Sequence, residues 1–213
     1  MWPYLAATCT LELTYFALLS FAYQRAELSV VYPLARGLAP VLVLTGAVAF
    51  TGAGTTPRQV AGVLLVGTGI VCVRGVRHGR GALLAVAIAC AIASYTVVDK
   101  HGIVHASPLA YVELMSVFTG LAYAAAVVGT RGVGALRAAL GWRAIAAGIG
   151  TFSAYACVLA ALRLASAASV AAVRESGVLV ATALGAIFLR ERVTPWRAGG
   201  AALVVAGVAL LSL

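Results

Sequence analysis

The sequence contains few charged residues. Only 10% of its 213 residues are Asp, Glu, Lys or Arg, and no more than six of these are acidic. A water-soluble domain has about a quarter of its residues charged, because polar groups must cover its surface. With 63% hydrophobic residues and a mean hydropathy of +1.05, the chain lacks that cover. This scarcity of charge excludes a soluble protein and predicts an integral membrane protein.

Long connecting segments and catalytic motifs are also missing. The apolar stretches are joined by connections too short for an extramembrane domain or a nucleotide-binding fold. No HExxH or GxGxD pattern is present, and the four cysteines fall inside apolar stretches without CxxC spacing. We therefore expect no enzyme activity, no metal ion and no cofactor. The net charge of +9 lies mostly in the short loops, so we expect no nucleic-acid partner either.

Eight apolar stretches are long enough to cross a bilayer, for which about 20 residues suffice. They lack the alternation of barrel strands, so we expect helices, which satisfy their own backbone hydrogen bonds in lipid. They cover residues 3–23, 28–50, 58–75, 81–98, 107–129, 141–163, 166–189 and 196–213. The predicted fold class is an all-α polytopic membrane protein with eight transmembrane helices.

The chain also carries an internal repeat. Shifted by 138 positions, it matches itself without gaps over about 50 residues. The matched pairs include Arg36 with Arg174, Thr56-Pro57 with Thr194-Pro195, Gly62 with Gly200 and Gly69 with Gly207. Each Thr-Pro pair is typical of a helix start, with Thr as the N-cap and Pro at the first helical position. Five spans separate equivalent helices, so the two copies must cross the membrane in opposite directions. We expect the first repeat in residues 1–77 and the second in residues 78–213.

Five ionisable residues lie well inside the predicted spans, namely Glu12, Arg36, Glu113, Arg174 and Glu175. Each costs about 2.5–3.5 kcal/mol at the centre of a membrane helix, so they must face one another or a water-filled cavity. Matching their depths at about 1.5 Å of rise per residue pairs Glu12 with Arg36 and Glu113 with Arg174. The alternative for Arg36 is that its long side chain reaches the membrane surface.

The stretch SVVYPLARGLAP places helix-breaking residues around Arg36. Pro33 and Pro40 each remove a backbone hydrogen bond, and Gly37 removes a side chain, so we expect a broken helix beside a cavity. Tyrosines also lie in the middle of spans, where they either contact a ligand or fill the core with satisfied hydroxyls. These are Tyr15, Tyr32, Tyr95, Tyr111 and Tyr155.

Three segments of the chain resemble the drug/metabolite transporter superfamily, specifically the ten-helix exporters built from two EamA-type repeats. They are AYQRAELSVVYPLARGLAPVLV at 22–43, SYTVVDKHG at 94–102 and LRERVTPWRAGGAALVVAGVALL at 189–211. The acidic residue that closes the family's ninth helix appears as Glu191, whereas Ala53 departs from the pattern in the first repeat. The resemblance implies an inverted 5+5 repeat that lacks its first two helices. A fragment, a misplaced start and a natural eight-helix form that dimerises would each account for that gap.

The resemblance implies a secondary transporter in a lipid bilayer, such as the cytoplasmic (inner) membrane of a bacterium. It would export a small metabolite, which could be an amino acid, an organic anion or a drug-like solute, by alternating access and with a proton as one candidate for coupling. The substrate-binding residues would be Arg36, Arg174, Glu175, Tyr32, Tyr15 and Tyr155. The proton-coupling candidates would be Glu12, Glu113 and Glu175. A homodimer is one possible assembly. The alternative function is a membrane scaffold or inactive truncated subunit, for which two intramembrane arginines would be costly.

Overall fold

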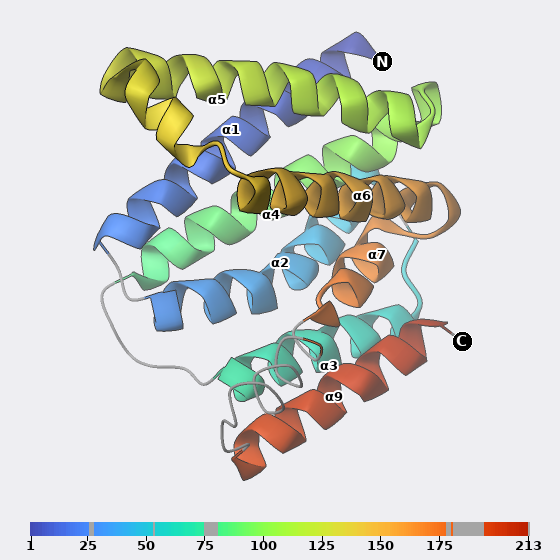
Figure 1. The fold of residues 1–213 in the computed structure, drawn as a ribbon. Helices are drawn as coiled ribbons and strands as arrows, with labels where there is room; N and C mark the ends of the chain where they lie inside the picture. The colour runs from blue at the N-terminus through green and yellow to red at the C-terminus, as the bar shows by residue number, and fades with distance from the viewer. Residues whose placement is uncertain (26–27, 53, 75–80, 178–179, 181–193, 213) are drawn as a thin grey trace.

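The computed structural model describes residues 1–25, 28–52, 54–74, 81–177, 180 and 194–212, and the regular elements in this part of the chain are all helices (Figure 1). They are α1 (Trp2–Arg25), α2 (Leu28–Thr51), α3 (Pro57–Arg74), α4 (Ala82–Gly102), the short 3-10 helix η1 (Ile103–His105), α5 (Pro108–Ala139), α6 (Trp142–Leu164), α7 (Ala167–Arg174) and α9 (Pro195–Ser212). This architecture confirms the predicted all-α polytopic membrane fold.

Four helical segments in the described part of the chain are long and apolar enough to span a membrane. They are Trp2–Ala22, Ala82–His105, Pro108–Ala139 and Trp142–Leu164. Shorter apolar segments, Leu34–Phe50, Pro57–Val73 and Ala198–Leu211, lie in α2, α3 and α9. The predicted span at 166–189 begins with α7, but its residues 178–179 and 181–189 lie outside the described residues, as does Glu191.

Helix starts follow the predicted Thr-Pro signal. Helix α3 begins at Pro57, and the Thr56 hydroxyl accepts a hydrogen bond from the Gln59 backbone N–H at 3.2 Å. The Gln59 side chain accepts in return from the Thr56 backbone N–H at 3.2 Å, which completes a capping box. Helix α9 begins at the equivalent Pro195. The bounds of α3 and α9 thus differ by the same 138 positions as the sequence repeat.

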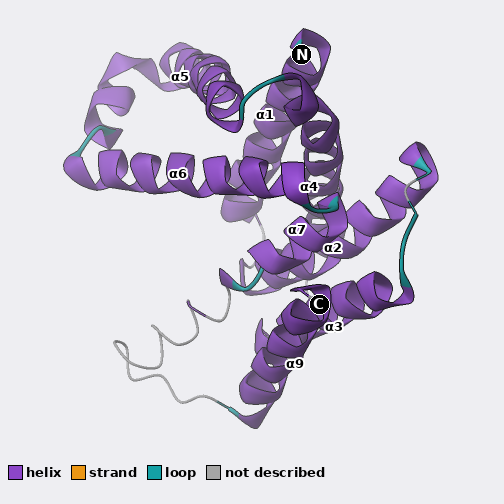
Figure 2. Ribbon diagram, turned by 90° about the vertical axis from the view of Figure 1, so that its right-hand side faces the viewer, coloured by secondary structure: helices purple, strands orange, loops and turns teal. Residues whose placement is uncertain are grey.

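Helices α3 and α9 lie side by side in both views of the fold (Figures 1 and 2). Two glycine pairs bring their backbones together: a Cβ added at Gly69 would lie 2.7 Å from the Gly200 carbonyl oxygen, and one at Gly62 would lie 3.1 Å from that of Gly207. The later residue on α3 faces the earlier residue on α9, so the two helices run antiparallel. Each pair also maps onto the other under the 138-residue shift, as expected for copies that cross the membrane in opposite directions.

Helix α2 differs from the prediction of a broken helix. It runs without interruption from Leu28 to Thr51, through the positions of Pro33, Gly37 and Pro40. Gly37 serves close packing instead, because a Cβ there would lie 3.1 Å from the carbonyl oxygen of Gly67 on α3. A proline removes only one hydrogen bond, and tight packing between α2 and α3 holds the helix together across that gap.

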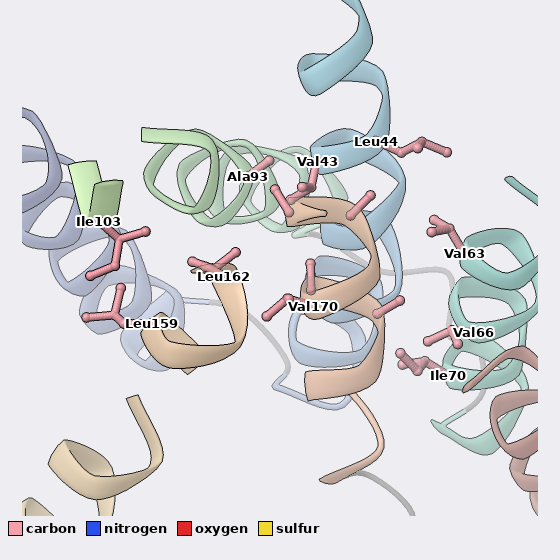
Figure 3. Close-up of a cluster of buried hydrophobic side chains, with 14 of the residues drawn as sticks. Val43, Leu44, Val63, Val66, Ile70, Ala93, Ile103, Leu159, Leu162 and Val170 are labelled. Carbon is pink, nitrogen blue, oxygen red and sulfur yellow. The ribbon is translucent and has the colours of Figure 1, made fainter. Parts of the chain in front are cut away.

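The core consists of two clusters of buried apolar side chains. The larger includes residues of η1 and of each described α-helix, and Figure 3 shows ten of its residues labelled, among them Val43 on α2, Val66 on α3 and Val170 on α7. The smaller joins α1, α2 and α4 through residues such as Ala22, Ala35 and Ile88. Helix α4 therefore packs against both α1 and α2, while α7 packs on α2 and also contacts α4.

Candidate functional site

Two arginines from equivalent positions of the repeat meet in the interior. Arg36 lies on α2 and Arg174 ends α7, two helices that pack on each other. Glu175 lies between them with its side chain only 4% exposed: its Oε1 accepts from Arg36 Nη1 at 3.0 Å and lies 3.9 Å from Arg174 Nε. The arginine side chains are 22% and 20% exposed, so each keeps part of its surface accessible. We call these three residues the arginine site.

A small pocket opens beside Arg36. Apart from Arg36 and Tyr15, the side chains that line it are apolar. The lining residues are Tyr15 and Leu19 on α1, Val31, Ala35 and Arg36 on α2, and Ile88 and Ile92 on α4. A guanidinium in an apolar wall attracts an anionic group strongly, because little water competes there. The pocket is about the size of one water molecule, so it can admit a single oxygen of an anionic group beside Arg36 but not a whole solute.

Tyr95 on α4 connects the arginine site to a row of aromatic rings. Its hydroxyl accepts a hydrogen bond from Arg174 Nη2 at 3.0 Å. Its ring centroid lies 6.1 Å from that of Tyr15 and 6.4 Å from that of Tyr155, with both pairs in edge-to-face orientation. Such contacts fix the ring orientations. Tyr15 and Tyr155 thus lie near the arginines, as a shared substrate site would require.

A second polar cluster surrounds Asp99, one turn after Tyr95 on α4. The Asp99 side chain is fully buried and accepts from the Thr8 hydroxyl at 2.6 Å and from the Tyr155 hydroxyl. The Thr8 hydroxyl also lies 3.1 Å from the hydroxyl of Tyr111 on α5. Helices α1, α4, α5 and α6 therefore each contribute one side chain to this cluster, which we call the Asp99 cluster.

The glutamates predicted for proton coupling occupy different environments. Glu12 on α1 is half-buried and accepts from the Thr119 hydroxyl of α5 at 3.3 Å. Glu113 is exposed on α5. Glu175 belongs to the arginine site. The structure therefore separates Glu113 from the groups that the sequence analysis placed with it.

The observed ion pairs differ from those expected by matching depths. Arg36 pairs with Glu175 where Glu12 was expected, and the described partners of Arg174 are Tyr95 and Glu175 where Glu113 was expected. Depth along a helix does not fix the direction in which a side chain points. Because α2 and α7 pack on each other, their equivalent arginines lie close together, and the Glu175 carboxylate lies near both.

Sequence reasoning missed Asp99 and Thr8. The predicted span ended at residue 98, one residue before Asp99, whereas α4 continues to Gly102. The signal was the spacing of Tyr95 and Asp99, which places both on one face of a helix. Two predicted residues cannot be placed in the site, because the side chains of Tyr32 and Pro33 lie outside the described residues.

Comparisons with known proteins agree with this architecture. The model of the EamA-like transporter family matches residues 79–213. A protein of known crystal structure has a similar fold, with a TM-score of 0.79 and 20% sequence identity over 99% of this chain and 76% of that one. Among curated proteins, none matches the chain.

Proposed function

The chain belongs to the EamA-like transporter family, whose members are transporters and not enzymes, and we propose that it exports a small anionic metabolite through the arginine site. An amino acid or organic acid with a free carboxylate fits this site best. The observation that carries the proposal is the pair of repeat-related arginines beside one buried glutamate and a small apolar pocket. We place the protein in the cytoplasmic membrane of a bacterium.

The arginines of this site support an anionic substrate. Both guanidinium groups lie near the Glu175 carboxylate and keep part of their surface exposed, where an anionic group could form charged hydrogen bonds with them. A scaffold would gain nothing from two arginines at this depth, since each charge is costly in the membrane. Alternating access requires that the site face each side in turn, and the antiparallel packing of equivalent helices favours such an exchange.

The test is counterflow of labelled carboxylates and zwitterionic amino acids in proteoliposomes. Arg36→Gln and Arg174→Gln should each weaken apparent substrate affinity about 10- to 100-fold, because each removes a charged hydrogen bond worth about 1.5–3 kcal/mol. Arg36→Lys, which keeps the charge, should recover part of this loss. Arg131→Gln, at an exposed position of α5, is the matched control and should behave as wild type.

Two results would contradict the proposal. Wild-type kinetics in folded Arg36→Gln and Arg174→Gln would place the substrate site elsewhere. Absence of counterflow for every solute in the wild-type protein, with a stable fold shown by its elution and melting profiles, would favour the scaffold function instead.

A further inference from the structure

Asp99 is a buried acid that the arginine site does not use. It is the only aspartate of the chain and is fully buried. Salt bridges among the described residues join Arg36, Arg174 and Glu175, and Asp99 takes part in none of them. A buried carboxylate without a cation in contact is costly in its charged form. The structure must therefore supply either strong donors or a proton.

The partners of Asp99 are hydroxyl groups, which fit either protonation state. Thr8 and Tyr155 donate to the two carboxylate oxygens, and Tyr111 adjoins Thr8. A hydroxyl can rotate from donor to acceptor, so this network can satisfy a carboxylate and equally a neutral carboxyl that donates its own proton. Glu175 differs, because its carboxyl oxygen pairs with Arg36.

Titratable groups on four neighbouring helices lie close enough to Asp99 for electrostatic or hydrogen-bonded interaction. They are Cys9 and Glu12 on α1, Tyr111 on α5, Tyr155 on α6 and Arg174 on α7.

Other charged or titratable groups near the cluster have partners elsewhere. On α4 itself, Lys100 donates to the backbone carbonyls of Leu162 and Ala165, and the His101 ring adjoins the Val97 carbonyl. On the remaining neighbours, Arg36 of α2 pairs with Glu175 and His105 of η1 stacks on Tyr4.

A chain of contacts links Asp99 to the arginine site. Arg174 donates to the Tyr95 hydroxyl, the Tyr95 ring meets the Tyr155 ring, and the Tyr155 hydroxyl donates to Asp99. Arg174 is also near enough to attract Asp99 when it is ionised. A substrate anion bound by Arg174 would offset that attraction and so favour protonation of Asp99. Binding of an anion and binding of a proton would then reinforce each other.

We propose that Asp99 is the proton-binding site of the carrier, which takes up one proton when an anion occupies the arginine site and releases it when the anion leaves. This inference rests on the proposed function; because proton and anion then move in the same direction, export is driven by the outward gradient of the anion and carries protons out with it. The proton adds to an Asp99 oxygen, the Thr8 or Tyr155 hydroxyl turns to accept or donate accordingly, and no bond other than those to hydrogen changes.

The first test needs no substrate. Infrared spectra of the protein in lipid, recorded across a pH titration, should show the carbonyl band of a protonated buried carboxyl that disappears as pH rises. Asp99→Asn should remove this band. Glu113→Gln, at an exposed position, should leave it unchanged. A band that persists in folded Asp99→Asn, or a wild-type spectrum without such a band at any pH at which the protein stays folded, would overturn the proposal.

The second test uses the carboxylate that counterflow identifies. A pH gradient should drive its accumulation in wild-type liposomes, and in Asp99→Asn this accumulation should fall at least tenfold while counterflow loses its dependence on pH. Accumulation driven by a sodium gradient, or pH-driven accumulation that survives Asp99→Asn, would contradict a proton site at Asp99. If no solute moves, the proposed function fails, and the infrared titration still decides the protonation of Asp99.

Discussion

At the scale of single residues, Glu175 is unusual because its carboxylate lies near two arginines. Arg36 and Arg174 occupy equivalent positions of the two repeats, whereas the position equivalent to Glu175 in the first repeat is Gly37. The same oxygen of Glu175 faces both guanidinium groups. Removal of this carboxylate would therefore leave two positive charges close together in the membrane interior, with their mutual repulsion unopposed.

Glu175→Gln should lower the free energy of unfolding by about 3 kcal/mol, the lower end for breaking a buried ion pair, since both arginines keep some exposure. Denaturation of the purified protein in detergent would measure the change. Glu113→Gln removes an exposed carboxylate and should change the free energy by no more than about 0.5 kcal/mol. Equal effects of the two substitutions would show that Glu175 does not neutralise the arginines.

The sequence identified charged residues that lie in the interior, but it did not identify their ion-pair partners. The cost of burying charge identified Arg36, Arg174 and Glu175 as functional candidates, and the structure brings these three together. Matching residues by their depth in the membrane could not identify these partners, because depth does not determine the direction in which a side chain points or which helix lies beside it. Asp99 was missed for a simpler reason: the end of α4 was placed four residues too early.

At the scale of elements, the crossing of α3 and α9 depends on glycine. A Cβ at Gly200 would lie 2.6 Å from the Gly69 carbonyl oxygen and 2.5 Å from the Val73 backbone nitrogen. These neighbours are backbone atoms, which cannot turn away as a side chain can. The close approach therefore requires glycine at this position, as in other small-residue helix contacts in membranes.

Gly200→Ala should destabilise the protein by about 1–3 kcal/mol, because the helices must separate to admit the methyl group. Its neighbour Gly199 on α9 has no atom within 4 Å of an added Cβ. Gly199→Ala is therefore the matched control, and it should be neutral or stabilising by up to about 1 kcal/mol. Thermal unfolding of both variants would measure the difference, and a Gly200→Ala protein as stable as Gly199→Ala would show that the crossing is loose.

Hydropathy predicted the bounds of most helices well, whereas proline positions wrongly predicted a break in α2. The predicted span 58–75 became α3 at Pro57–Arg74, and 141–163 became α6 at Trp142–Leu164. Helix α5 runs on to Ala139, well past the predicted end at 129, with a non-helical glycine at Gly132 (φ 78°) inside it. The predicted break in α2 did not occur because packing against α3 outweighed the local effect of proline. Tertiary contacts of this kind are invisible to a local pattern.

At the scale of the whole molecule, two contacts join helices that are equivalent in the repeat. Helix α3 meets α9 through glycines, and α2 meets α7 through the arginine site. The charges that we propose for substrate binding therefore lie where equivalent helices of the two repeats contact each other. A motion that exchanges the conformations of the halves would expose this site to each side in turn.

The charges of the arginine site and of Asp99 have an electrical consequence. Arg36 and Arg174 carry two positive charges, and Glu175 and, in the proposal above, an ionised Asp99 carry two negative charges, so this group of four is neutral in the empty carrier. If one monovalent anion and one proton enter together, the group is neutral in the loaded carrier as well. A membrane potential performs work of about 2.3 kcal/mol per elementary charge per 100 mV. Because these groups carry no net charge in either state, the potential performs no net work on them.

Transport by the wild-type protein should therefore proceed at the same rate whatever the voltage across the liposome membrane. In Asp99→Asn the empty carrier keeps one surplus positive charge, so an inside-negative potential would hold its site toward the inside and slow its return. Counterflow measured at potentials set by a potassium gradient and valinomycin would compare the two proteins. A voltage-dependent wild type would contradict this balance of charges. If the proposed balance holds, transport would depend on the gradients of the anion and of pH, and the membrane voltage of a cell would not change its rate.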